Sequence, residues 1–435
     1  MVCWRMYSMV NGIDTYKDSG VEWIGKIPQD WKVNKIGSIY DERRTKVSDN
    51  EYQPLSVTKN GILPQLENVA KSDDSDNRKL VKSGDFVINS RSDRRGSCGI
   101  AHQDGSVSLI NSVLQPKSNM DNRYYNFVFK SENFADEFYR WGHGIVDDLW
   151  TTKWTDMKSI YIPYPSIKEQ QAIADYLDKK CGEIDKVVET EKAVIEKLKE
   201  YKQSIITEAV TKGLDKSVPL KDSGIEWIGK IPAHWEVKRT KFAADSFDKG
   251  NGITKEDVLS DGDIQCIRYG EIYSKYDKQC SKTVSATNVN MIDSPKYISK
   301  GDILFAGTGE LIEEIGKNIV YTGNDPCLAG GDIIILKHKQ NHIFLNYVLN
   351  SHYAQSQKSY GKVKLKVVHI SASAIGNVKI ALPSLEEQQQ IANYLDKKCS
   401  EIDQAITHKE QVIEKFTEYK KSLIYECVTG KKEMA

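Results

Sequence analysis

The stretch SIKEQQAIADYLDKKCGEIDKVVETEKAVIEKLKEYKQSIITEAVT at residues 166–211 decides the fold, because it returns at residues 384–429 as SLEEQQQIANYLDKKCSEIDQAITHKEQVIEKFTEYKKSLIYECVT. In both copies, apolar residues recur at steps of three and four, which is the pattern of one stripe along a long helix. The stripe comprises Ile173, Leu177, Cys181, Ile184, Val188, Ile195, Leu198, Ile205 and Ala209 in the first copy, and Ile391, Leu395, Cys399, Ile402, Ile406, Ile413, Phe416, Leu423 and Cys427 in the second. One apolar stripe on an otherwise charged helix predicts a partner helix.

Both helices have a well-specified start. Ser166 and Ser384 each follow a proline and precede a glutamate, Glu169 or Glu387, by three residues, which is the pattern of a capping box. Apart from Gly182, neither stretch contains a glycine or a proline. Each helix can therefore continue for about 44 residues, or roughly 66 Å at 1.5 Å per residue.

The composition is that of an ordinary soluble protein. The chain has 435 residues, of which 39% are hydrophobic and 28% charged, so it can hold two or three domains. No apolar run approaches the length of a membrane span, and the first residues lack the apolar core of a signal peptide. We expect a cytoplasmic protein without membrane contact. Because basic and acidic residues both number 61, nucleic acid would bind only where basic residues are concentrated locally.

The eight cysteines form no CxxC pair, and three of them, Cys181, Cys399 and Cys427, fall on the helical stripes. This distribution predicts reduced, partly buried thiols, and it supports neither disulfides nor a metal site.

The repeat extends beyond the helices. The leader KDSGVEWIGKIPQDWKV at 17–33 returns as KDSGIEWIGKIPAHWEV at 221–237, so the chain consists of two tandem copies of one unit. The leaders are 204 positions apart and the helices 218, which makes the second intervening body 14 residues longer. The two copies have similar leaders and helices but different bodies. This predicts one common framework that carries two different recognition surfaces. The leader tryptophans are expected to be core anchors: Trp23, Trp31, Trp227 and Trp235.

Both bodies show short β-prone runs punctuated by glycine, with a helical stretch among them. The order is the same in each, which predicts two mixed α and β domains of the α+β class. The expected strands lie at 84–90, 105–111 and 157–165 in the first body and at 301–307, 330–337 and 376–384 in the second, with helical stretches at 122–140 and 342–357.

Three phrases and their second-half counterparts carry a family resemblance: SGVEWIGKIPQDW, SRSDRRGSCGIA at 90–101, and IPYPSIKEQQAIADYLDKKCGEID. They resemble the specificity subunit of type I restriction-modification systems, over both leaders, both strands before the helices and both helices. The interiors of the two bodies carry little of the likeness.

The resemblance implies a subunit without chemistry of its own. In that family two target-recognition domains each read one half of a bipartite, asymmetric DNA sequence, and two long helices pack antiparallel as a coiled-coil spacer. The expected partners are double-stranded DNA, two modification subunits that methylate adenine, and restriction or motor subunits that complete a phage-defence enzyme. S-adenosylmethionine, Mg and ATP are then expected only in the partner subunits.

This resemblance implies a division of the chain into six parts. They are an N-terminal extension at 1–15, target-recognition domain 1 at 16–165, spacer helix 1 at 166–213, target-recognition domain 2 at 214–383, spacer helix 2 at 384–430 and a tail at 431–435. The residues agree with such a role, because two copies of one unit suit the pseudo-two-fold symmetry of duplex DNA. Helices of roughly 66 Å span about 19 base pairs.

The first body contains two candidate DNA-binding runs. Arg91, Arg94 and Arg95 lie in the loop SRSDRRGS, and an arginine can donate two hydrogen bonds to a guanine edge. The alternative is that Asp93 pairs with one arginine while the others meet phosphate or water. The second run is WGHGIVDDLWTTKWTD at 141–156, where we expect phosphate contacts from Thr151, Thr152 and Lys153.

In the second body, Lys362, Lys364 and Lys366 alternate with apolar residues in SYGKVKLKVVH at 359–369. On a strand they would share one face and bind phosphate, or they would simply protect a solvated edge strand. Arg268, in a mixture of aromatic and basic residues, is a further candidate for DNA contact.

The spacer seam contains one charged position in each helix. Glu191 and Lys409 are equivalent in the two copies, and antiparallel helices would bring these charges together and help to set their register. The predicted seam is Leu177, Ile184, Val188, Glu191, Ile195, Leu198, Leu395, Ile402, Lys409, Ile413 and Phe416.

An enzyme remains a rival interpretation. FAGTGE at 305–310 has the F-x-G-x-G look of a loop that holds S-adenosylmethionine, which would make the chain a self-sufficient adenine methyltransferase. The first copy has FVINSRS instead, and the sequence at 324–327, NDPC, lacks the second proline and the ring of the adenine-binding tetrapeptide. We therefore expect no catalytic residues. The rival without chemistry is a coiled-coil adaptor that recognises proteins.

Overall fold

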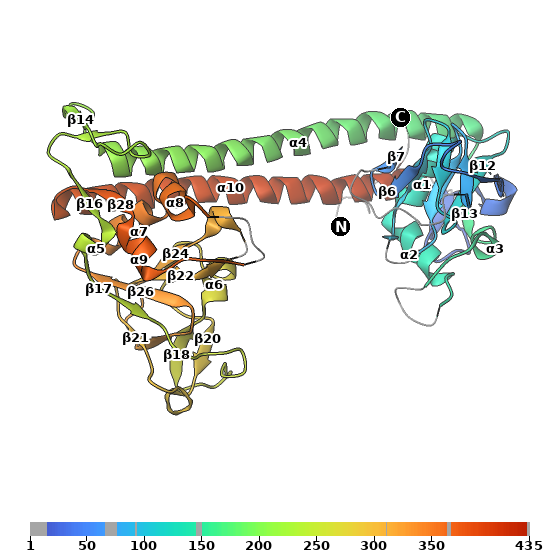
Figure 1. Cartoon of the computed structure of the whole chain (residues 1–435). Coiled ribbons are helices and arrows are strands. Elements are labelled where there is room, and N and C mark those ends of the chain that lie inside the picture. The colour runs from blue at the N-terminus through green and yellow to red at the C-terminus, as the bar shows by residue number, and fades with distance from the viewer. Residues whose placement is uncertain are drawn as a thin grey trace. The chain divides into compact units, whose positions relative to one another are not determined.

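The computed structural model describes residues 15–65, 76–91, 94–144, 150–309, 311–362 and 367–432, without the side chain of residue 313. Its contacts divide the chain into two units (Figure 1). Unit 1 comprises Met1–Lys192 and Glu410–Ala435, and unit 2 comprises Ala193–Lys409. Each unit therefore contains one body and a part of both long helices.

The two long helices are α4, Ile167–Lys212, and α10, Leu385–Val428. The predicted capping boxes are present at both starts. In the first, Ser166 N donates to Glu169 Oε2 at 3.0 Å, and Glu169 N donates back to Ser166 Oγ at 3.4 Å. In the second, Glu387 N donates to Ser384 Oγ at 3.3 Å.

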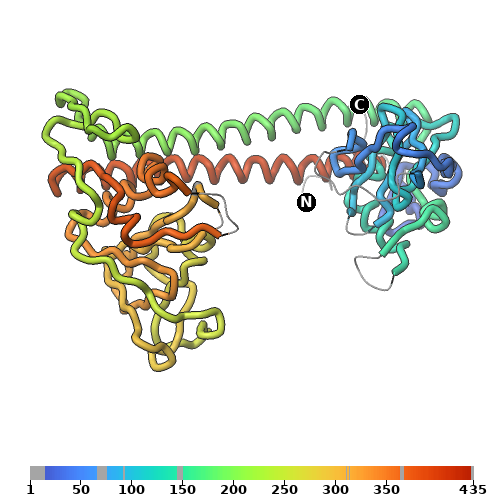
Figure 2. The backbone as a smooth tube through the Cα atoms, in the orientation of Figure 1, coloured from blue at the N-terminus to red at the C-terminus, as the bar shows by residue number. Residues whose placement is uncertain are grey.

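Within each unit the two helix segments run side by side and antiparallel (Figures 1 and 2). The predicted stripes form the contact, because their side chains are buried together in the core of each unit. The buried stripe residues are Ile173, Leu177, Cys181, Ile184, Leu423 and Cys427 in unit 1, and Ile195, Ile205, Ala209, Ile391, Leu395, Cys399 and Ile402 in unit 2.

In each unit an ion pair joins the two helix segments. Asp185 and Lys420 are 2.6 Å apart in unit 1, and Lys202 and Asp403 are 2.6 Å apart in unit 2. The two pairs are repeat equivalents, since each residue of one helix has its counterpart 218 positions along the chain. Partly exposed ion pairs stabilise little, but equivalent pairs indicate that both units use the same helix register.

The body of unit 1 is built from small antiparallel sheets. A four-stranded sheet has the order β10-β9-β12-β4 and a three-stranded sheet has the order β11-β8-β5, while β1–β2, β6–β7 and β3–β13 form pairs. The strands are β1 Tyr16–Asp18, β2 Lys26–Pro28, β3 Lys32–Lys35, β4 Tyr40–Glu42, β5 Lys46–Val47, β6 Leu55–Thr58, β7 Gly61–Pro64, β8 Arg78–Val81, β9 Phe86–Asn89, β10 Cys98–Ile100, β11 Gly105–Val107, β12 Asn111–Pro116 and β13 Tyr161–Tyr164. The helices are η2 Ile36–Ser38, α1 Asn122–Lys130, α2 Glu132–Arg140 and α3 Trp154–Met157.

The body of unit 2 repeats this plan with larger sheets. Its main sheet has the order β17-β26-β22-β24-β19, and a second has the order β20-β18-β25-β21. Helices α7 and α8 lie between the main sheet and α10 (Figure 1). The strands are β14 Leu220–Asp222, β15 Lys230–Pro232, β16 Glu236–Arg239, β17 Ala244–Lys249, β18 Ile264–Ile267, β19 Gln279–Cys280, β20 Ser285–Thr287, β21 Tyr297–Ile298, β22 Ile303–Ala306, β23 Thr308–Gly309, β24 Asn318–Tyr321, β25 Cys327–Ala329, β26 Ile333–His338, β27 Val368–His369 and β28 Lys379–Leu382. The helices are α5 Thr240–Ala243, α6 Tyr269–Ser274, η5 Val289–Met291, η6 Ile312–Glu314, α7 His342–Leu349, α8 His352–Ser359 and α9 Ala372–Asn377.

The predicted order of strands and helices is present in both bodies, but the expected strand at 105–111 is wrong in its extent. The structure has two strands there, β11 and β12, which belong to different sheets. A turn between them is closed by the Asn111 amide, which donates to Ser108 O at 3.0 Å. Each predicted helical stretch is likewise two short helices, because Ser131 and Ser351 cap a second helix within it.

Three of the four leader tryptophans are core anchors, as predicted, but Trp227 is not. Trp23 is 6% exposed and packs edge-on against Phe134 of α2 at 5.7 Å, whereas Trp227 is 41% exposed and packs against the exposed Tyr360. Counted from the helix caps, the residue at the place of Phe134 in unit 2 is Ala354. The small alanine cannot cover Trp227 as the Phe134 ring covers Trp23, so Trp227 stays exposed.

Lys358 provides a test of the packing of unit 2. This lysine of α8 is 3% exposed, and its ammonium donates to Gly316 O at 2.7 Å and to Leu349 O at 2.9 Å. Burial lowers the pKa of Lys358 to about 7. In the unfolded chain a lysine stays protonated up to about pH 10.4, so the unfolded state binds more protons between these values and stability rises with pH there.

We predict that Lys358→Met removes this pH dependence. Between pH 7 and 9 the wild-type chain should gain roughly 1 kcal/mol of unfolding free energy per pH unit relative to the variant. Urea unfolding of both chains at several pH values measures the difference. Lys300→Met, at an exposed site, is the control, and parallel pH profiles for wild type and Lys358→Met would contradict the prediction.

Candidate nucleic-acid interface

A pocket of 460 Å³ lies in unit 1 where the ends of β4 and β9 meet the segment before α3. Four of its residues are cationic and one is acidic. The lining is Glu42, Arg44, Lys79, Ser90, Arg91, Leu109, Ile110, Ser112, Thr151, Lys153, Trp154 and Thr155. Three of the predicted DNA-binding residues, Arg91, Thr151 and Lys153, are therefore brought together from two separate stretches of sequence.

Backbone pairing holds these two stretches together. Arg91 and Thr151 form an isolated antiparallel bridge, and Thr152 N donates to Ser90 O at 2.9 Å. The Asn89 side chain accepts from Arg91 N at 3.0 Å, which fixes the backbone as it leaves β9. The side chains of Arg91 and Lys153 thus stand on a defined backbone.

The charges of this pocket are only partly balanced. Glu42 accepts from Arg44 at 2.7 Å and lies 3.3 Å from Lys79, whose ammonium also donates to Asn111 O at 2.8 Å. Within the described part of the chain, Arg91 and Lys153 have no carboxylate within ion-pairing distance. One carboxylate among four cations leaves a positive field, which attracts phosphate.

The other predicted DNA-binding residues of unit 1 make contacts within the protein. Thr152 is 2% exposed and its hydroxyl donates to Phe138 O at 2.7 Å. This buried side chain holds two segments of unit 1 together, whereas the sequence predicted that it would contact phosphate. Arg95 pairs with Asp136 and lies 5.9 Å from the centre of the Tyr139 ring. Arg94 N donates to Arg91 O at 3.3 Å in the turn that follows.

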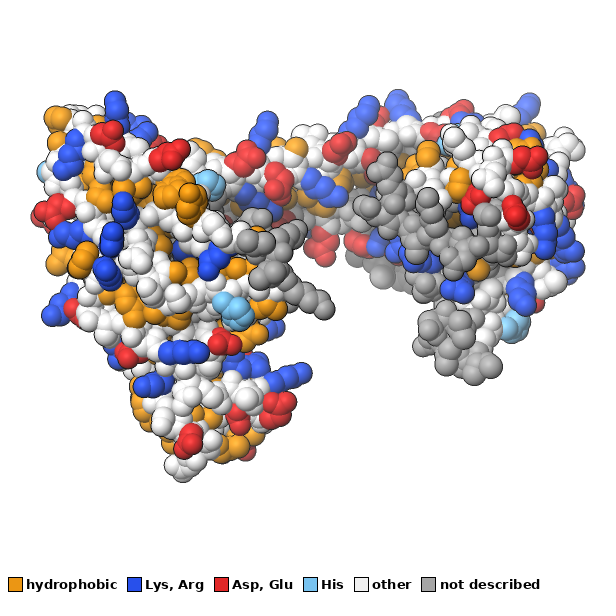
Figure 3. Space-filling model, viewed as in Figure 1, with side chains coloured by type: hydrophobic (Ala, Val, Ile, Leu, Met, Phe, Trp, Pro, Cys, Tyr) orange, Lys and Arg blue, Asp and Glu red, His pale blue; other side chains and the backbone are white. Residues whose placement is uncertain are grey.

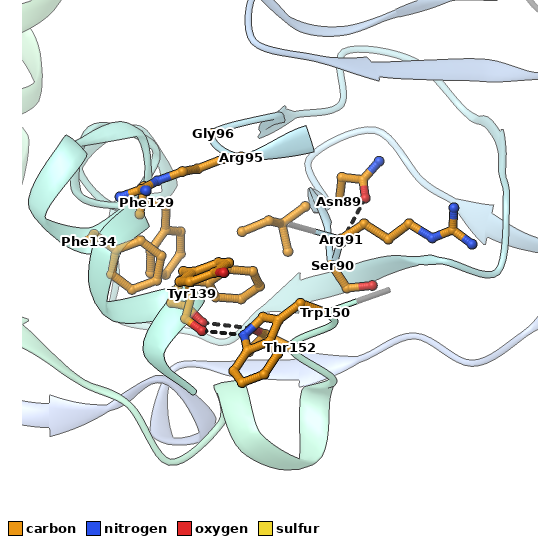
Figure 4. Close-up of a pocket in the computed structure, with 13 residues that line it drawn as sticks. Asn89, Ser90, Arg91, Arg95, Gly96, Phe129, Phe134, Tyr139, Trp150 and Thr152 are labelled. Carbon is orange, nitrogen blue, oxygen red and sulfur yellow. Dashed lines mark hydrogen bonds between the residues drawn. The ribbon is translucent and has the colours of Figure 1, made fainter. Parts of the chain in front are cut away.

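Figure 4 shows how these residues are divided around a small hollow. Arg95 lies over the aromatic side of the hollow, whereas the guanidinium of Arg91 extends away from it. Trp150 stacks on Tyr139 at 5.7 Å, and its Nε1 donates to Tyr139 O at 2.8 Å. The hollow measures 20 Å³, which is about the room for one water molecule, so its rings are packing residues and no platform for a base.

Unit 2 has a pocket of 350 Å³ at the corresponding place, where the ends of β17 and β22 meet the segment before α9. Thr308 pairs with His369 here as Arg91 pairs with Thr151 in unit 1. The lining is Phe247, Asp248, Lys249, Gly307, Thr308, Asp332, Ile334, His369, Ile370, Ser371 and Ala372. The two pockets lie at the same place in the fold but differ in their charged residues. The unit 2 pocket has two carboxylates and one lysine, whereas the unit 1 pocket has four cationic residues.

Sequence reasoning missed the second pocket, although one signal for it exists. Aligning GDFVINSR at 84–91 with GDILFAGT at 301–308 places Thr308 opposite Arg91. The glycine-rich run that resembled a cofactor loop is thus a wall of this pocket. A Cβ on Gly307 would lie 2.8 Å from Asp332 O, so this position requires glycine for a close backbone approach.

The predicted residues of unit 2 are distributed differently. Lys362 lies beside the unit 2 pocket, because its ammonium donates to His369 O at 2.7 Å. Lys364 and Lys366 lie outside the described residues. Arg268 is the N-cap residue of α6 and its Nε donates to the buried Glu271 at 2.9 Å, so its guanidinium is tied to the helix that it caps.

The predicted partners Glu191 and Lys409 fall in different units, and their approach stays a prediction. On the face shown in Figure 3, Lys and Arg side chains are interspersed with Asp and Glu.

Among the residues that the structure describes, no group of His, Cys, Asp and Glu is arranged to hold a metal ion. The seven described cysteines are free and buried. No helix in the described ranges is long and apolar enough to cross a membrane.

Comparison with known proteins identifies the domains. The family model for the type I restriction modification DNA specificity domain matches residues 28–200 and 232–415. The type I restriction enzyme MjaVIII specificity subunit of Methanocaldococcus jannaschii is 25% identical over 93% of this chain and 94% of its own length. The StySPI specificity subunit of Salmonella potsdam is 23% identical over 86% of this chain and 82% of its own length.

Two solved structures share the fold. A chain from a study of complex assembly and conformational transition of the type I R-M system superposes with a TM-score of 0.72 at 14% identity, over 92% of this chain and 98% of the other. The HsdS subunit from Thermoanaerobacter tengcongensis superposes with a TM-score of 0.53 at 16% identity, over 93% and 98%. The matched domains cover most of the sequence, and we conclude that the chain belongs to the family of type I restriction-modification specificity subunits.

Proposed function

We propose that this chain selects a bipartite, asymmetric DNA target, with one half-site bound by each unit, and positions adenine-methylating and DNA-cleaving subunits on it. The observation that carries the proposal is the pair of pockets at one place in the fold with different side chains. A protein that reads two unlike half-sites needs a common framework and different contact residues.

The unit 1 pocket has the chemistry of a DNA contact. Lys153 supplies an ammonium group for phosphate, a contact that fixes a protein on the duplex without choosing a sequence. Arg91 supplies a planar donor pair, which matches the O6 and N7 acceptors of guanine in the major groove. Guanine in the half-site bound by unit 1 is therefore part of the proposal.

A catalytic role has less support. A loop that holds S-adenosylmethionine follows a strand of a parallel sheet and leads into a helix. Here β22 lies between antiparallel partners, β24 and β26, and the glycine-rich run continues into the strand β23. In our proposal this chain performs no chemistry, and S-adenosylmethionine, Mg and ATP bind to the partner subunits in the cytoplasm.

We predict that Arg91→Ala and Lys153→Ala weaken DNA binding in different ways. Arg91→Ala should reduce affinity about tenfold and relax one base position, whereas Lys153→Ala should weaken binding to every sequence and lower the salt slope by about one. Fluorescence anisotropy with labelled duplexes at several salt concentrations measures both. Arg140→Ala, which removes an exposed arginine paired with Glu22, is the matched control. Full DNA binding by both pocket variants would favour a protein adaptor.

We further predict that the purified chain alone transfers no methyl group from labelled S-adenosylmethionine to DNA. Co-expression with its modification subunit should instead produce methylated adenines within a two-part motif. Methylome sequencing gives both half-sites and the gap between them. Methyl transfer by the chain alone would establish the rival methyltransferase.

A further inference from the structure

The walls of the unit 2 pocket carry acceptors where those of unit 1 carry donors. Asp248, Asp332 and Lys249 line it together with the polar side chains of Thr308 and His369. The hydroxyl of Thr308 and Nδ1 of His369 are 3.1 Å apart. Carboxylates repel phosphate, so this pocket suits contact with a base edge better than contact with the DNA backbone.

Asp332 is the aspartate of this pocket whose backbone adopts an uncommon conformation. Its φ of +60° lies in the left-handed region, which is uncommon for residues other than glycine and asparagine or aspartate. Its carbonyl accepts from Gly307 N at 2.7 Å, in the close approach that requires glycine at 307. The backbone of Asp332 is thus fixed, and its carboxylate, 51% accessible, can present acceptor oxygens to a ligand.

Unit 1 has the same backbone contact with a different side chain. Ser90 N donates to Ile110 O at 3.3 Å, which places Ile110 where unit 2 has Asp332. The framework thus leaves this position free to vary in chemistry. Lys249 Nζ lies 3.8 Å from Asp332 Oδ1 and its side chain is 73% exposed, so it can meet phosphate while the carboxylate faces a base.

We propose that Asp332 determines specificity in unit 2 by accepting a hydrogen bond from the N4 amino group of a cytosine in the major groove. This inference rests on the proposed function of the chain. A carboxylate offers only acceptors. In a C·G pair the cytosine amino donor has an acceptor on one side only, O6 of the paired guanine, so a carboxylate can approach it from the C5 side. In an A·T pair the adenine amino group lies between two acceptors, N7 of adenine and O4 of thymine, which repel a carboxylate on both sides.

Two substitutions test the role of Asp332 without changing the backbone. Glycine and asparagine both tolerate a φ of +60°, so Asp332→Gly and Asp332→Asn keep the fold while removing the charge. In methylomes of cells that carry the chain with its modification subunit, Asp332→Gly should lose the preference for cytosine at one position of one half-site. Asp332→Asn should shift that position towards adenine, because an amide pairs with adenine N6 and N7. The other half-site should stay unchanged in both.

Binding measurements give a second readout. On duplexes that differ only at this position, the complex with wild-type chain should prefer cytosine about tenfold, and the Asp332→Gly complex less than about twofold. Asp261→Asn, an exposed aspartate outside the pocket, should behave as wild type. An unchanged motif in both Asp332 variants, or a change in both half-sites, would overturn the inference. A wild-type chain that directs no two-part methylation would instead remove the proposed function itself, and this inference with it.

Discussion

The fold depends on a hydrogen bond that ties each leader to the start of a long helix. Trp31 Nε1 donates to Glu169 at 3.0 Å in unit 1, and Trp235 Nε1 donates to Glu387 at 3.2 Å in unit 2. Burial works against the charge of Glu169, but the hydrogen bonds from Ser166 and Trp31 outweigh it and keep the pKa of this carboxyl below its ordinary value. One glutamate thereby caps a helix and anchors a tryptophan of the core, so the leader and the helix start can change only together.

A second pair of equivalent residues extends this framework to the bodies. The buried Gln170 and Gln388 accept from the backbone amides of Asp121 and Asn341, at 2.9 Å in each unit. These amides precede α1 and α7, so each long helix positions the first helix of its body. The pockets lie beyond these anchored elements, on strand ends whose backbone is paired in both units while the side chains differ.

The sequence predicts the long helices and the repeat because both follow from local patterns, namely apolar spacing and capping residues. It predicts less where the outcome depends on a distant side chain. Trp227 is identical in the repeat to Trp23, yet its burial depends on what α8 supplies. Likewise Arg91 and Thr151 are recognisable singly as polar loop residues, but their pairing is tertiary. Asp332 carries no sequence signal of its own, because only the folded backbone gives it a left-handed conformation opposite Gly307.

The buried cysteines of the helix stripe allow the separation of α4 and α10 in unit 1 to be measured chemically. Burial raises the pKa of Cys181 to about 11 and that of Cys427 to about 12, so at neutral pH neither thiol is ionised while the helices are packed. Alkylation requires a thiolate that the reagent can reach. The rate at which a reagent such as iodoacetamide labels these two sulfurs therefore measures how often α4 and α10 separate in unit 1. No cysteine has to be introduced by mutation for this measurement.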